Sequence, residues 1–198
     1  MTLSLRLFSI STLLIGLSAA ASAGPILWTF SGATLTDGGT ITGSFDFDAD
    51  TNTYSNVNVV TTPGSLLSGS VYSFVCGQDV ASCTGVTPNS AEVLLLASNA
   101  TDQTGLPALA LFFTGIGGVP PAGLTDAGGT IDISNTSLSV GAAQEAPCSD
   151  AACAAPGSPA RFTTAGDVVG TPEPSTWGLL AAGFGMIAAF ARRTARYR

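Results

Sequence analysis

Apolar and polar residues alternate with a period of two along most of the chain between residues 24 and 171. Successive side chains of a strand point to opposite faces of a sheet, so this alternation predicts half-buried β-strands. Gly, Asn, Asp and Pro separate the runs, and no helical period runs through this region. The expected strands are 26–30, 40–48, 54–60, 70–75, 92–96, 109–113, 130–134 with 137–140, and 161–164 with 168–169.

This number of short strands, joined by short connections, predicts an all-β fold. We expect an antiparallel β-sandwich or jelly-roll-like single domain. The clearest element is a hairpin over residues 39–62, with its turn at Asp48–Asn52. Residues 141–160 are rich in Ala, Pro and Ser, and we expect them to form a loop or covering segment.

The N-terminal segment has the three parts of a secretory signal peptide. Arg6 supplies a positive charge, residues 7–17 are apolar, and Ala21-Ser22-Ala23 offers the small residues that signal peptidase accepts. The apolar run is shorter than a membrane span and no stop-transfer pattern follows it, which makes an N-terminal anchor the weaker interpretation. Residues 1–23 are therefore predicted to be removed by signal peptidase, with cleavage after Ala23 leaving Gly24 as the new N-terminus.

The C-terminal segment also has three parts in a fixed order. Pro172, Glu173 and Pro174 favour an extended chain, because proline has no backbone N–H and a fixed φ. Residues 175–191 carry no charge and predict a helix of about 25 Å, at the short end of what spans a bilayer. The cations that follow would hold their end of this transmembrane helix in the cytoplasm; they are Arg192, Arg193, Arg196 and Arg198.

This tail resembles the PEP-CTERM sorting signal of exported proteins in Gram-negative bacteria, which the membrane-embedded exosortase recognises. The resemblance covers residues 171–198 alone. It implies exosortase as a partner, an inner-membrane intermediate, a final place at the cell surface or in the extracellular matrix, and an exopolysaccharide or biofilm context. An ordinary C-terminal anchor is the alternative, although such an anchor gains nothing from a rigid charged tripeptide at its outer edge.

The chain is thus expected to consist of a signal peptide (1–23), a β-sandwich body (24–170) and a sorting signal (171–198). The wording of the 39–62 hairpin is also similar to a body module of other PEP-CTERM proteins, which brings no activity with it. Residues 24–171 contain twelve acidic residues and one basic residue, Arg161, for a net charge of −11. A body this acidic is repelled by phosphate backbones, which excludes nucleic acid as a partner.

Four cysteines in an exported chain predict two disulfides. Their proximity in the sequence favours Cys76–Cys83 and Cys148–Cys153, although four cysteines permit three connectivities. A zinc site is disfavoured, because the chain has no histidine and neither pair has Cys-x-x-Cys spacing.

The hairpin turn carries an alternating set of oxygen ligands that suggests calcium. Asp48, Asp50 and Asn52 lie within the turn and are the weak candidates, whereas Asp46 is too far along its strand to share one ion with them. An EF-hand loop needs glycine at its sixth position and a bidentate glutamate at its twelfth, and this run has neither. We therefore expect a polar outer face that ends in an Asx turn, with no metal or other cofactor.

Catalysis has little support in the sequence. The absence of histidine rules out Ser-His-Asp and Cys-His systems. Glu92 and Glu145 are available for glycoside hydrolysis, but one strand glutamate and the lone body tryptophan, Trp28, do not outline a sugar cleft. We expect a non-enzymatic protein. One alternative is a carbohydrate- or calcium-binding module. Another is an ice-binding protein, since such tails also carry the label of an ice-binding protein C-terminal domain. Thr-x-Thr pairs occur in the body, but no fixed repeat stacks them.

Overall fold

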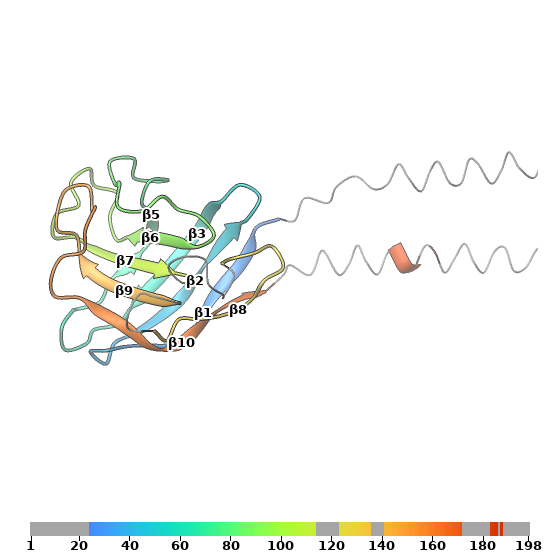
Figure 1. The fold of residues 1–198 in the computed structure, drawn as a ribbon, viewed down its shortest axis with the longest axis horizontal. Helices are drawn as coiled ribbons and strands as arrows, with labels where there is room; N and C mark the ends of the chain where they lie inside the picture. The colour runs from blue at the N-terminus through green and yellow to red at the C-terminus, as the bar shows by residue number, and fades with distance from the viewer. Residues whose placement is uncertain (1–23, 114–122, 136–140, 172–182, 186, 188–198) are drawn as a thin grey trace, which may run out of the picture.

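The computed structural model describes residues 24–113, 123–135, 141–171, 183–185 and 187 (Figure 1). Between residues 24 and 171 its regular elements are β-strands, and all pairings between them are antiparallel. This confirms the predicted all-β, antiparallel class. The strands are β1 (Ile26–Leu35), β2 (Thr40–Asp48), β3 (Thr53–Thr61), β4 (Val71–Tyr72), β5 (Phe74–Val75), β6 (Glu92–Leu96), β7 (Pro107–Phe112), β8 (Gly129–Asp132), β9 (Ala142–Pro147) and β10 (Arg161–Thr171).

The strands form one sheet that closes almost into a barrel, rather than two separate sheets (Figure 1). Their order is β4-β3-β2-β1-β10-β9-β7-β6-β5, and β8 adds to β10. The long strand β10 joins the two halves of this order, β4-β3-β2-β1 and β9-β7-β6-β5. Its first residues, Arg161 and Phe162, pair with β9, while residues from Thr163 onwards pair with β1. At the far end only Ser73 separates β4 from β5, so the chain itself links the two outer strands of the sheet.

Aromatic side chains fill the space between the two halves. The ring of Phe45, on β2, lies 5.5 Å from Tyr54 of β3 and 5.9 Å from Phe113, which directly follows β7. Trp28 of β1 is only 1% exposed. Burial of such large rings contributes most of the hydrophobic stabilisation of a domain this size.

The 39–62 hairpin is present as predicted, with β2 paired to β3 on either side of the turn. One irregularity interrupts the ladder between Ser44 and Asp46. Asn56 lies opposite it at φ 50°, in the left-handed region that Asn tolerates better than most residues. The extra residue on β3 keeps the apolar face of the hairpin directed inwards on both sides of this bulge.

The expectation of a loop over residues 141–160 was wrong for its first part. β9 occupies Ala142–Pro147 and lies inside the sheet, between β7 and β10. Alanine, Gln and Glu are poor strand formers, and β9 forms because its neighbours pair with it along both edges. β1 also extends beyond the predicted 26–30, through Gly32 at φ 64°, and β10 is continuous where two pieces were expected.

The predicted strand 137–140, the signal peptide 1–23, and the sorting tripeptide with Arg192 and Arg193 lie outside the described residues. Of the predicted transmembrane segment 175–191, the described residues 183–185 and 187 are helical. Within the described parts of the chain, no helix is long and apolar enough to cross a membrane.

Candidate functional site

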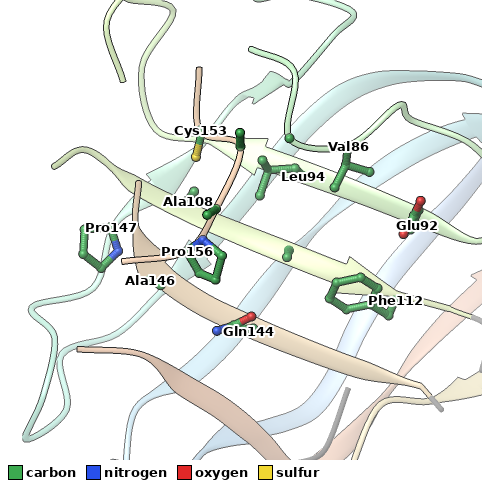
Figure 2. A pocket seen from close by; sticks show the side chains of 14 residues that line it. Val86, Glu92, Leu94, Ala108, Phe112, Gln144, Ala146, Pro147, Cys153 and Pro156 are labelled. Atoms are coloured by element: carbon green, nitrogen blue, oxygen red, sulfur yellow. The ribbon is translucent and has the colours of Figure 1, made fainter. Parts of the chain in front are cut away.

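A shallow groove of about 360 Å³ lies on the outer face of β6, β7 and β9 (Figure 2). Its floor is made of small side chains, Ala108 and Ala110 from β7 and Ala146 from β9, with Leu94 of β6 beside them. The alternate residues of these strands, such as Leu109, point the other way into the core. These side chains make the floor of the groove apolar. The volume of the groove lies within the range of small-ligand sites.

Both disulfides belong to the loops that form the walls of this groove. Cys76–Cys83 has an S–S distance of 2.05 Å and Cys148–Cys153 one of 1.91 Å, so both predicted pairings are present. The four sulfurs pack with the outward side chains of β6 and β7 in a second small core.

The two disulfide loops also bind each other. The amide of Thr84 donates a hydrogen bond to the carbonyl of Ala152 at 2.9 Å. Gly85 lies so close to the carbonyl of Cys153 that a Cβ at residue 85 would be 2.1 Å from that oxygen. The walls therefore act as one cross-linked unit over the sheet, and the groove is preformed.

Two polar side chains border the groove on the two sides of β7. Glu92 of β6 lies opposite Phe112 in the ladder, and Gln144 of β9 lies opposite Ala110 (Figure 2). Within the described part of the chain, no hydrogen bond uses the Glu92 carboxylate or the Gln144 side-chain amide. Both side chains line the groove.

The most concentrated charge in the body lies inside it, on Arg161 at the start of β10. Its side chain is fully buried, and its Nη1 bonds both carboxylate oxygens of Asp37 at 3.1 and 3.0 Å. Its Nε and Nη2 donate to Oε2 of Glu145 at 3.0 and 2.7 Å. The other oxygen of Glu145 accepts a hydrogen bond from the Thr61 hydroxyl at 3.1 Å. One guanidinium therefore joins the β1–β2 turn, β9 and β10.

Local sequence makes room for this cluster. A Cβ on Gly39 would lie 2.5 Å from Nη1 of Arg161, so glycine is needed there to admit the guanidinium. Burial alone would raise the pKa of Asp37, but hydrogen bonds from Gly39, Leu66, Arg161 and Leu67 outweigh it and hold this pKa below its ordinary value of 3.8. The carboxylate is thus kept ionised where it meets the arginine.

The structure places the weak calcium candidates in the β2–β3 turn. The Asp48 carboxylate accepts a hydrogen bond from the Thr51 amide at 3.0 Å, and Asn52 has φ 54°. The turn is held from outside by Asp126, whose carboxylate accepts the Ala49 amide at 3.0 Å. No group of three or more His, Cys, Asp or Glu residues within the described ranges is arranged to hold a metal ion.

Residues considered for other activities are already engaged. Glu145 is 2% exposed and bound to Arg161, while Trp28 is buried and cannot stack on a sugar. The hydroxyls of Thr34 and Thr164 contact each other at 3.0 Å, as those of Thr51 and Thr53 do at 2.7 Å. These threonines serve the fold by pairing across or along strands.

Sequence reasoning missed both the groove and the buried cluster. The groove depends on β9, in a region where the sequence predicts a loop. The cluster depends on Arg161, which the sequence marks only as the single positive charge of the body. The signal was nevertheless present, because a lone cation among twelve carboxylates is the residue best suited to neutralise buried ones.

The described body ends at Thr171, where β10 ends. Residues 171–196 match the family model of the PEP-CTERM protein-sorting motif. A search among curated proteins found no match, and a search among solved structures found none either. The motif identifies an exported protein that passes through the membrane and is sorted by an exosortase.

Proposed function

We propose that this chain is a non-enzymatic β-domain protein that exosortase delivers to the cell surface or the extracellular matrix, in an exopolysaccharide or biofilm context. The observation that carries the proposal is the match of residues 171–196 to the sorting motif. The body that precedes it carries two disulfides, which persist only in an oxidising compartment outside the cytoplasm. Both features agree with export.

At the other end of the chain, we propose that signal peptidase removes residues 1–23. Ala21 and Ala23 provide the small residues at the cleavage site, and Gly24 lies two residues before the start of β1. N-terminal sequencing of the exported protein should find Gly24. Retention of Met1 would overturn this part of the proposal.

The body's chemistry supports a structural or binding role rather than catalysis. The chain has no histidine, and the most buried carboxylates, those of Asp37 and Glu145, are neutralised by Arg161. A general acid or base needs a proton that it can exchange with a substrate, and a carboxylate held by a guanidinium is poorly suited to that role.

The sorting function is tested by following an epitope tag placed after Arg198 in the native host. The surface-located protein should lose the tag in cells that contain exosortase and keep it in cells that lack the enzyme. Glu173→Ala should impair processing while leaving membrane insertion intact, because the apolar run and the arginines are unchanged. The matched control is Glu92→Ala, which also removes one glutamate but lies on the body. A tag that stays on the mature surface protein would leave the ordinary-anchor alternative in its place.

A binding role for the groove on β6, β7 and β9 is the second candidate. Its volume of about 360 Å³ and its preformed walls support it. A glycan array tests the carbohydrate version of this role. Ala110→Leu, which would fill the groove, should abolish any binding found there, whereas Thr29→Leu on β1 should not.

A further inference from the structure

No linker separates the folded body from the sorting motif. Thr171 is the last residue of β10 and pairs with Leu27 of β1, and Pro172 is the next residue in the sequence. The Pro-Glu-Pro tripeptide therefore starts where the sheet ends. An enzyme that acts there meets the folded body immediately upstream.

The end of β10 is enclosed on both of its edges. Val169 pairs with Thr29 of β1 on one side and with Thr130 of β8 on the other. Gly170 is held in the same way, between Trp28 and Gly129. Enzymes that take up extended peptides bind their backbone along a free edge, and neither Val169 nor Gly170 has one.

A side-chain contact closes the same end of the strand. Gly170 lies over the indole of Trp28, so that a Cβ on residue 170 would be 2.8 Å from three atoms of the ring. Real Cβ atoms do not approach a ring this closely, so glycine is needed at residue 170 for β10 to pack against Trp28. Val169 and Gly170 are thus fixed by two ladders, Gly170 also by a buried tryptophan, and Thr171 by its pairing with β1.

We propose that the end of β10 controls processing of the sorting signal: residues 169–171 must detach from β1 and β8 before the sorting enzyme can engage the Pro-Glu-Pro tripeptide. This inference rests on the proposed sorting function, and it holds that local opening of the body sets the rate at which the sorting signal is processed. The tripeptide itself is the recognition element, and the strand before it determines how often that element becomes accessible.

The experiment is a pulse-chase in the native host that follows loss of a C-terminal tag from the full chain. A flexible Gly-Ser spacer of about six residues between Thr171 and Pro172 spans about 13 Å and frees the tripeptide without altering the body. It should speed tag loss at least about threefold. Gly170→Ala, which pushes β10 away from Trp28, should also speed it, and the spacer should add little to that variant.

The matched control is Gly85→Ala, which creates a closer clash, with its Cβ 2.1 Å from the Cys153 carbonyl oxygen, in a loop that does not contact the end of β10. It should leave the rate within about 1.5-fold of the unmodified chain. Acceleration by Gly85→Ala as large as that by Gly170→Ala would show that global stability, not the β10 end, sets the rate. A spacer variant processed no faster than the unmodified chain would overturn the proposal.

Failure of the sorting function looks different from failure of this inference. If the unmodified chain keeps its tag in cells with exosortase, the sorting function fails and the control by β10 falls with it. If the unmodified chain is processed and the spacer changes nothing, only the control by β10 fails. Glu173→Ala combined with the spacer should stay unprocessed, because acceleration must act through the tripeptide.

Discussion

Replacing Arg161 by methionine is the most severe test of how this body is held together. Methionine keeps much of the length and removes the charge, leaving the carboxylates of Asp37 and Glu145 buried without a counter-ion. Breaking a buried ion pair by removing one partner costs about 3–5 kcal/mol. A domain of this size loses about 2–4 °C of melting temperature for each kcal/mol, so the expected decrease is about 10 °C.

The assay is thermal unfolding of residues 24–171, followed by far-ultraviolet circular dichroism, with the disulfides intact. Arg161→Lys should be intermediate, because lysine restores a charge but cannot bond both carboxylates through a planar fork. The decisive variant adds Asp37→Asn and Glu145→Gln to Arg161→Met. It should recover a large part of the loss, since the cost arises from uncompensated charge rather than from missing contacts.

A decrease of less than about 3 °C for Arg161→Met would refute the reasoning. It would mean that water reaches the two carboxylates once the arginine is gone, or that they take up protons at little cost. A triple variant no more stable than the single one would point to lost packing of the arginine side chain instead.

Three further predictions concern the body. Asp37 has a lowered pKa in the folded state, so its contribution to stability is full above its ordinary pKa of 3.8 and is lost as the pH falls through its folded pKa. Acid titration of the melting temperature should show this loss below about pH 4. Asp37→Asn should remove this pH dependence. Replacing Cys148 and Cys153 together by alanine should cost about 2 kcal/mol in chemical denaturation, and peptide mapping that finds either cysteine joined to another partner would contradict the structure. Millimolar calcium should raise the melting temperature by less than about 5 °C, because the 48–52 turn lacks a complete ligand set, and a larger increase would establish a metal site.

The hairpin could be predicted because its information is local. Alternation across β2 and β3 fixes which face is buried, and the Asp- and Asn-rich run between them specifies a turn within a few residues. The two disulfides could be predicted for the same reason, since they join cysteines only 7 and 5 residues apart. Wherever the determining contacts are close in sequence, the pattern was sufficient.

β9 and the ion cluster could not be predicted in this way. β9 has the composition of a loop, and its strand conformation is imposed by β7 and β10 on its two edges. Arg161 meets Asp37 across 124 residues of sequence and Glu145 across 16. An arginine is normally exposed, so nothing local marks this one as buried. The groove inherits the same difficulty, because its floor needs β9 in place.

The burial of Arg161 has a consequence for what happens after processing. The other cations of the chain are Arg6 and the four arginines from 192 onwards, and all of them belong to the segments proposed to be removed. Residues 24–171 retain a net charge of −11, and their one arginine is 0% exposed. The anionic surface of a membrane attracts basic side chains and repels acidic ones. Under the proposed processing, loss of the tail would remove, in one step, the apolar run and the arginines proposed to bind the lipid. It would leave a body whose charge opposes return to the membrane. Sorting and release would then be driven by the same cleavage, with no separate dissociation step required.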